Sequence, residues 1–200
     1  MKIIVLGGFL GSGKTSVLIG LAKRFAGVDE NGKPKVIIIE NEIGETGVDD
    51  KMLKTGGYTV ENMFSGCACC SIAGEMIQNV KDIIRDFDPE MIIIESSGVG
   101  YPHEIKANLK RSLGLDSIII AVVDAKRWKR MLIPMEQMLK DQLINTDFVF
   151  VNKIDLVDSE MVEFVNNSVQ GFVPGAKVFD VSAIAGIDNM IVDEILSGLQ

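Results

Sequence analysis

The chain has 200 residues, of which 47% are hydrophobic and 24% charged, so it can form one domain with a single large core and is unlike a disordered chain. Its formal net charge of −8 argues against broad electrostatic binding to nucleic acid or to an anionic membrane, because both are polyanions. No segment reaches the roughly 18 apolar residues of a membrane span, and the apolar run Ile3–Leu6 is too short for a signal peptide, so we expect a cytoplasmic protein.

Short β-branched runs alternate with longer segments along the chain. The predicted strands are Lys2–Leu6, Lys35–Glu40, Met91–Glu95, Ser117–Asp124, Phe148–Asn152 and Lys177–Val181. Most of these strands are apolar on both faces, which is typical of parallel strands covered on each side by helices. The predicted fold class is therefore α/β, a doubly wound and mainly parallel sheet with helices on both faces.

Apolar residues at helical spacing fill the segments between the strands. The predicted helices are Lys14–Ala26, Ser71–Phe87, Pro102–Leu113, Met135–Ile144, Ser159–Val169 and Asp188–Leu199, with Gly114 as a C-cap of the third. The basic stretch Lys126–Arg130 contains Trp128, and we expect a solvated helix face there rather than a contact with nucleic acid.

The glycine-rich stretch from Gly8 to Thr15 matches the pattern G-x-x-x-x-G-K-[ST], between a predicted strand and a predicted helix. Its backbone N–H groups and the N-terminus of the helix can surround the phosphates of a nucleotide. Lys14 would neutralise the β- and γ-phosphates and so counts as catalytic, and the hydroxyl of Thr15 would bind Mg²⁺. The predicted nucleotide-binding residues of this P-loop are Gly11, Ser12, Gly13, Lys14, Thr15 and Ser16.

Residues 152–155, Asn-Lys-Ile-Asp, follow a predicted strand and resemble the N-K-x-D base-recognition motif of GTP-binding proteins. The carboxylate of Asp155 can accept hydrogen bonds from N1–H and the 2-amino group of guanine, and adenine would leave it unpaired. We therefore predict GTP as the nucleotide, bound by Asn152, Lys153 and Asp155. Ser182 and Ala183 follow the last strand and resemble the loop whose backbone contacts the guanine oxygen.

Glu95 and Gly98 lie at the end of another predicted strand, in the pattern E-x-x-G. A carboxylate at this place lies beside Mg²⁺, and Gly98 leaves room for a backbone N–H to reach the γ-phosphate. Asp49 is the candidate for orienting water or Mg²⁺. Because no glutamine follows Gly98 to position water, we expect GTP hydrolysis to be slow without a partner.

All three cysteines fall within four positions, as Cys67, Cys69 and Cys70, directly before a predicted helix. Thiolates near a helix N-terminus suit a soft or borderline metal ion, Zn²⁺ above all, with Co²⁺, Ni²⁺ or Cu⁺ as further candidates. Glu40, Glu45 or water could supply a further ligand. The alternative is that the cysteines are small buried hydrophobic residues at a strand–helix junction.

Together, the P-loop, Glu40-Asn41-Glu42, Asp49, Cys-x-Cys-Cys, E-x-x-G and N-K-x-D occur in the order seen in CobW-type GTPases, which the chain resembles over nearly all its length. The resemblance implies a single P-loop GTPase domain over residues 1–200, without the separate C-terminal domain common in that family. It also implies that GTP hydrolysis controls delivery of a transition metal, zinc or cobalt, to a client protein. Glu40, Glu45 and the three cysteines would then form the metal site.

Two other functions remain open. The chain could be a GTP-dependent chaperone that loads a cofactor enzyme, such as a corrinoid-dependent one, or a switch whose cysteines sense metal or redox state. The partner would be a client metalloprotein or a cofactor enzyme, and relatives with this fold commonly form nucleotide-dependent homodimers.

Overall fold

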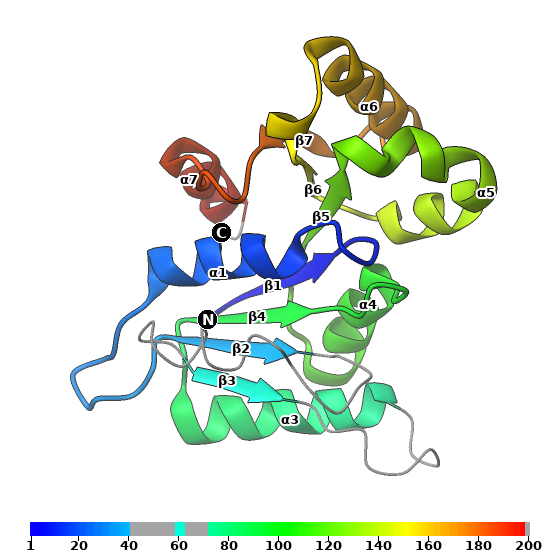
Figure 1. Ribbon diagram of the computed structural model, residues 1–200. Helices are drawn as coiled ribbons and strands as arrows, with labels where there is room; N and C mark the ends of the chain where they lie inside the picture. The colour runs from blue at the N-terminus through cyan, green and yellow to red at the C-terminus, as the bar shows by residue number, and fades with distance from the viewer. Residues whose placement is uncertain (41–58, 63–71, 199–200) are drawn as a thin grey trace.

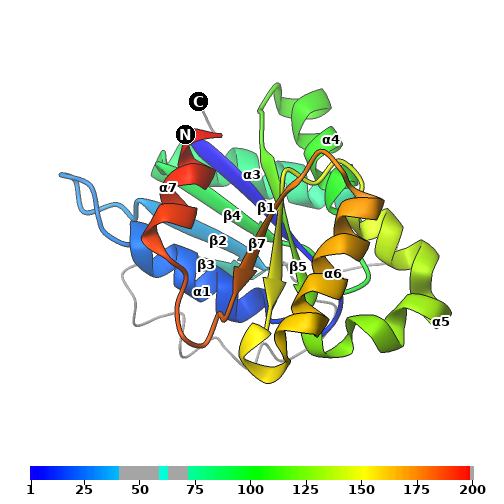
Figure 2. The same ribbon diagram turned by 90° about the horizontal axis from the view of Figure 1, so that it is seen from above.

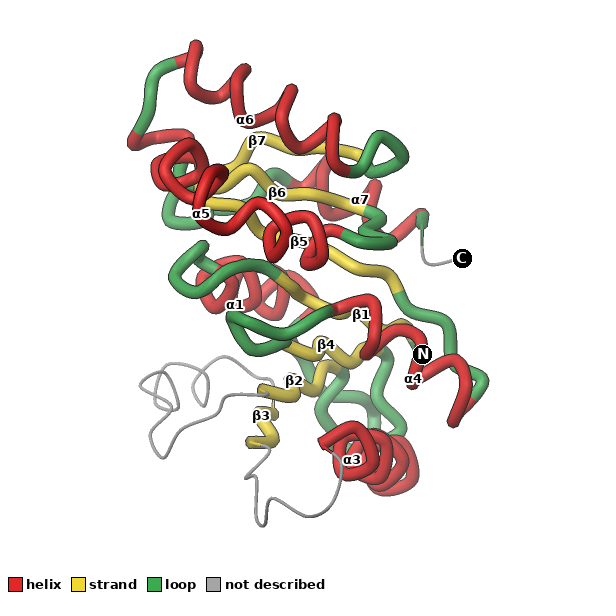
Figure 3. Tube along the Cα trace, turned by 90° about the vertical axis from the view of Figure 1, so that its right-hand side faces the viewer, coloured by secondary structure: helices red, strands yellow, loops and turns green. Residues whose placement is uncertain are grey.

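Figure 1 shows the computed structural model of the protein, which describes residues 1–40, 59–62 and 72–198. Its described strands form one sheet in the order β3-β2-β4-β1-β5-β6-β7, with every neighbouring pair parallel. Figure 3 follows this order along the Cα trace. The strands are β1 (Lys2–Gly7), β2 (Val36–Glu40), β3 (Thr59–Asn62), β4 (Met91–Glu95), β5 (Ile118–Asp124), β6 (Phe148–Asn152) and β7 (Lys177–Val181).

Helices lie between the consecutive strands wherever the structure describes a helix-containing connection, as parallel crossover connections require. They are α1 (Lys14–Phe25), α3 (Ile72–Phe87), α4 (Pro102–Leu113), α5 (Ala125–Leu143), α6 (Ser159–Phe172) and α7 (Asn189–Ser197), with a short 3-10 helix, η1 (Ile154–Leu156). Gly114 ends α4 with a φ of 70° and donates its N–H to the carbonyl of Lys110, which confirms the predicted C-cap.

The two faces of the sheet bury alternate residues of each strand. On one face Ile4 and Leu6 pack with the apolar residues of α1 and α7. On the other face Ile3 and Val5 pack with α3 and α4, while β5 and β6 pack with α5 and α6. Figure 2 shows α1 and α7 on the opposite side of the strands from α4 and α6. The doubly wound α/β fold predicted from the sequence is therefore confirmed.

Two elements differ from the sequence prediction. Strand β3 was not predicted, because its four residues include Thr59 and Asn62 and do not form an apolar run. Helix α5 begins at Ala125, ten residues before the predicted Met135, and contains Pro134. The expected solvated face at Trp128 is wrong for the tryptophan itself, whose side chain is buried between α5 and α6 and donates from Nε1 to Ser168 Oγ over 2.9 Å.

The parallel arrangement brings the carboxyl ends of all strands to one edge of the sheet. The loops after β1, β4, β5, β6 and β7 leave from this edge, which is where ligands bind in open α/β sheets. Within the described ranges, no helix is both long and apolar enough to cross a membrane.

Candidate functional site

The loop from Gly8 to Gly13 joins β1 to α1 and fits tightly against β5 and β6. A Cβ atom on Gly8 would lie 2.2 Å from the carbonyl oxygen of Val122. Gly13 has a φ of 99°, and its Cβ would lie 2.3 Å from Nδ2 of Asn152. Side chains at these two positions would displace the loop, so the glycines of the motif are required by the packing as well as by the turn.

Helix α1 starts at Lys14 with Gly13 as its N-cap, and no side chain caps it. Because the first N–H groups of a helix have no partner within the helix, this end favours an anion. Ser12 and Lys14 are buried, Gly13 and Thr15 are half-buried, and Gly11 and Ser16 are exposed. The described geometry is that of a phosphate-binding loop.

Asn152 connects the P-loop to the loop after β7. Its Nδ2 donates to the carbonyl of Ser12 over 2.9 Å, and its Oδ1 accepts from the backbone N–H of Ala183 over 2.9 Å. The side chain is 2% exposed, and both ends of its amide are paired. Asn152 therefore fixes three segments relative to one another: the P-loop, the end of β6, and residues 182–183.

Lys153 and Arg127 each donate to a carbonyl of the P-loop, and both also pair with the carboxylate of Asp124. Lys153 Nζ donates to the carbonyl of Gly11 over 2.6 Å and to Asp124 Oδ2 over 2.7 Å. Arg127 donates to the carbonyl of Leu10 over 2.6 Å and, from Nε, to the same Asp124 oxygen over 2.7 Å. These bonds hold two P-loop carbonyls, those of Leu10 and Gly11, toward the two cations.

Asp124 ends β5, is 1% exposed and caps α5 by accepting from the N–H of Arg127. Burial alone would raise the pKa of this carboxyl. The hydrogen bonds and positive charges of Lys153 and Arg127 outweigh burial and hold the pKa below its ordinary value. Asp124 therefore remains a carboxylate at neutral pH.

Asp155 lies in η1, two residues after Lys153, and its side chain is exposed. The described residues place no hydrogen-bond partner on its carboxylate, so it remains available to a ligand at this edge. Ser182 and Ala183 are half-buried, and the turn that they begin is closed by donation from the N–H of Ala185 to the carbonyl of Ser182. The residues of the predicted base site are thus brought to one end of the P-loop.

Glu95 ends β4, and its Oε1 lies 3.5 Å from Oγ1 of Thr15, which lies in the first turn of α1. A hydroxyl and a carboxylate are oxygen ligands of the kind that Mg²⁺ prefers, so these two residues fit that ion. Glu40 ends β2 and is the register partner of Glu95 on the neighbouring strand. Because register partners of parallel strands lie side by side about 4.8 Å apart, Glu40 is adjacent to this pair.

Gly98 lies in the loop after β4 and touches the P-loop. A Cβ on Gly98 would lie 2.8 Å from Cα and 2.9 Å from N of Leu10. Only a residue without a side chain fits at this approach, which leaves the backbone of Gly98 beside the phosphate-binding loop.

Five predicted site residues lie outside the described part of the chain: Asp49, Glu45, Cys67, Cys69 and Cys70. Among the described residues there is no group of three or more His, Cys, Asp and Glu side chains that could hold a metal ion. Of the residues predicted to bind the transition metal, the described part of the chain contains Glu40.

Sequence reasoning missed Asp124, Arg127 and Gln142, which hold the loops of this site from β5 and α5. Their partners lie far away in the chain: Arg127 contacts Leu10, and Gln142 contacts Gly98. The only local signal was Asp124 at the end of a strand and at the N-cap position of a helix.

This fold and this edge define a P-loop nucleotide-binding protein. The chain matches the family model described as CobW/HypB/UreG, nucleotide-binding domain, over residues 2–180, and it belongs to that family. It is 28% identical over 197 residues to a zinc chaperone CobW of Sinorhizobium sp, covering 82% of this chain and 54% of that protein. The chain thus spans about half the length of the curated relatives it matches.

Solved structures show the same fold at low sequence identity. The hydrogenase maturation factor HypB of Archaeoglobus fulgidus superposes with a TM-score of 0.72 at 16% identity, over 100% of this chain and 91% of that one. The Zn(II)-bound YjiA GTPase of E. coli has a TM-score of 0.68 at 21% identity, over 96% of this chain and 60% of that one.

Proposed function

We propose that this domain binds GTP with Mg²⁺. The observation that carries the proposal is the placement of Asn152, whose amide joins Ser12 of the P-loop to Ala183, while Asp155 lies exposed in η1, three residues further along the chain. Phosphate-binding and base-recognition segments are thereby held at one edge. Thr15 and Glu95 would hold Mg²⁺, which when bound supplies positive charge to the phosphates.

The base specificity can be tested with Asp155→Asn. The variant replaces one of the two acceptor oxygens with an N–H₂ donor, so one of the two guanine donors, N1–H or the 2-amino group, loses its acceptor and faces another donor. We expect a loss of GTP and GDP affinity of about a hundredfold or more, measured with fluorescent nucleotides, and a gain for xanthosine nucleotides. Glu160→Gln, an exposed change at the start of α6, is the control. Tighter binding of ATP than of GTP by the unmodified protein would exclude the proposal.

Hydrolysis of GTP would use Lys14 to stabilise charge on the phosphates and Glu95 to hold Mg²⁺, with Asp49 as the candidate for orienting water. Because Val99 and Gly100, and no glutamine, follow Gly98, we expect slow turnover in the absence of a partner. Single-turnover measurements of phosphate release with Lys14→Ala and Asp49→Ala would separate these roles.

The cargo of this GTPase is proposed to be a transition metal, zinc or cobalt, delivered to a client protein. The names of the curated relatives support this proposal, since several are zinc chaperones. The ligands would be Cys67, Cys69, Cys70, Glu40 and Glu45. The register between Glu40 and Glu95 supports a connection between the two sites, because a metal bound at Glu40 would lie on the strand next to the predicted Mg²⁺ ligand.

Coupling between metal and nucleotide can be measured by titrating the reduced protein with Zn²⁺ against a chromophoric competitor. We expect the zinc affinity to differ by about fivefold or more between the GDP complex and the complex with a non-hydrolysable GTP analogue. Glu40→Gln should lower the affinity, and Glu30→Gln, in an exposed loop, should leave it unchanged. Equal affinity in both complexes would favour cobalt as the cargo, the cofactor-enzyme chaperone or the redox switch.

The remaining proposals concern the whole protein. We infer a cytoplasmic location, a client metalloprotein or cofactor enzyme as partner, and a homodimer that forms with nucleotide. The organisation of residues 1–200 as a single domain stays a prediction. Analytical ultracentrifugation with GDP and with the GTP analogue measures the association directly.

A further inference from the structure

Gln142 is a buried polar side chain near the C-terminal end of α5. It is 2% exposed, and its Nε2 donates to the carbonyl of Gly98 over 2.9 Å and lies 3.5 Å from the carbonyl of Gly100. Buried amides stay buried at low cost only when they are hydrogen-bonded. The partner of this amide is therefore the backbone of the loop after β4.

Backbone hydrogen bonds hold that loop at both ends. The N–H of Ser96 donates to the carbonyl of Leu6 in β1, and the N–H of Gly100 closes a turn onto the carbonyl of Ser97. Between these two points, Gly98 touches the P-loop at Leu10. The carbonyl that Gln142 holds thus belongs to the residue where the two loops meet.

Helix α5 holds both loops, one on each side of a kink. Before the kink, Arg127 donates to the carbonyl of Leu10, and after it, Gln142 donates to the carbonyl of Gly98. The kink lies at Met135, which has a φ of −134° and follows Pro134. The distance between the two side chains is therefore set by the bend of one helix.

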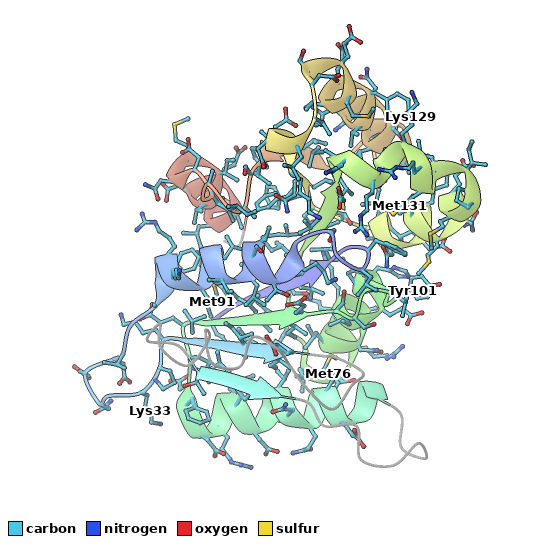
Figure 4. The ribbon with its side chains drawn as sticks, in the orientation of Figure 1. Lys33, Met76, Met91, Tyr101, Lys129 and Met131 are labelled. Carbon is cyan, nitrogen blue, oxygen red and sulfur yellow. The ribbon has the colours of Figure 1, made fainter. Side chains whose placement is uncertain are left out.

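A small pocket lies between the P-loop, β5 and α5. Its walls include Phe9, Trp128, Met131, Leu143 and Gln142, and the stick view shows Met131 on the side of α5 toward the centre of the molecule (Figure 4). Apolar packing excludes water from the amide of Gln142, so its hydrogen bond to Gly98 is not exchanged freely for a bond to solvent.

We propose that Gln142 is a positioning residue for the γ-phosphate. It fixes the backbone of Gly98 against the P-loop, so that the loop after β4 meets a nucleoside triphosphate in the orientation that binds it. GDP has no γ-phosphate and would lack this contact. Gln142 therefore sets the preference of the site for GTP over GDP, an inference that rests on the proposed function.

The variant Gln142→Met tests the inference, because methionine has a similar shape and no donor. We expect GDP affinity to change less than about twofold, whereas affinity for a non-hydrolysable GTP analogue falls about fivefold to tenfold, the size of one lost hydrogen bond. The matched control is Gln137→Met, on the same helix, whose exposed amide donates to Asp141. Both affinities should be unchanged in this control.

Equal losses for GDP and for the GTP analogue would overturn the inference, since a merely structural role would affect both nucleotides. No change for either would overturn it as well. Failure of the unmodified protein to bind guanine nucleotides would instead refute the proposed function, and the inference with it.

A second measurement needs no variant. In the isotope-labelled unmodified protein, the side-chain amide resonance of Gln142 should shift and gain exchange protection with the GTP analogue relative to GDP. Identical resonances in the two complexes would contradict the inference even if Gln142→Met fails to fold.

Discussion

At the scale of single residues, the site is organised by one buried carboxylate, that of Asp124. Asp124 pairs with two cations, and each cation donates to one carbonyl of the P-loop. Preorganisation of this kind lets the N–H groups of the loop face an anion before it arrives, so less free energy is lost on ordering when the nucleotide binds.

We expect Asp124→Asn to lower the free energy of unfolding by about 1–3 kcal/mol at neutral pH, because two charge-assisted hydrogen bonds are lost. The pKa of Asp124 is lowered in the folded state, so its contribution is fully present above the ordinary carboxyl pKa of about 4 and is lost as the pH falls through the folded-state value. Denaturant unfolding should therefore show a constant difference between variant and unmodified protein from about pH 5 to 8 that shrinks below about pH 4.

The control for this experiment is Asp116→Asn. Asp116 also pairs with a lysine, Lys110, but its side chain is 85% exposed, and exposed pairs contribute little. A loss of stability as large in this variant as in Asp124→Asn would contradict the role of the buried network.

Glycines provide a second residue-scale prediction. Gly13→Ala places a methyl group 2.3 Å from Asn152 Nδ2 at a φ of 99°, so the P-loop must shift. We expect GDP and GTP affinities to fall together by at least about tenfold, as measured by nucleotide fluorescence.

Gly171→Ala is the matched comparison. Gly171 lies in α6, and a Cβ there meets no atom of the described residues within 4 Å. Because alanine is the better helix former, this change should raise the free energy of unfolding by about 0.5–1 kcal/mol and leave binding unchanged. Similar binding by both alanine variants would mean that the fit at Gly13 is unimportant.

At the scale of elements, α5 and α6 are joined by a polar contact within an apolar interface. Trp128 donates to Ser168 over 2.9 Å, and the indole is 1% exposed. Trp128→Phe should cost about 1–3 kcal/mol of unfolding free energy, from the lost hydrogen bond and the smaller volume. Urea unfolding of Trp128→Phe, of Ser168→Ala and of the double variant measures the coupling free energy between the two side chains. Additive effects would show that the two side chains do not interact.

The sequence predicts most elements because their signals are local. Apolar β-branched runs mark six strands, and helix α4 runs over the predicted Pro102–Leu113. Strand β3 could not be predicted in this way, because it has no apolar run and is defined by its pairing with β2. The first half of α5 was not predicted as a helix because it contains a cluster of basic residues and is followed by Pro134. Burial of Trp128, a tertiary contact, stabilises this part of the helix.

At the scale of the molecule, the parallel sheet collects residues that are far apart in the chain. Gly13, Glu95, Asn152 and Ala183 lie along one edge because each is at, or shortly after, the carboxyl end of a strand. Sequence motifs could name these residues, because the P-loop and N-K-x-D patterns are local. The support from Arg127 and Gln142 could not be predicted, since each depends on a contact that spans 44 or more residues.

Asn152, Lys153 and Arg127 join the P-loop to the ends of β5 and β6 and to the loop after β7. Because these segments belong to different parts of the sheet, nucleotide binding at this edge should stabilise the whole domain. A ligand at about a hundredfold above its dissociation constant adds about 2.7 kcal/mol to the free energy of unfolding. Thermal unfolding with Mg²⁺ should therefore shift upward with GDP and the GTP analogue, and not with ATP at the same concentration. Asp155→Asn should remove most of the shift with guanine nucleotides. A shift with ATP equal to that with GTP would place recognition in the phosphates alone and leave no role for the exposed carboxylate of Asp155.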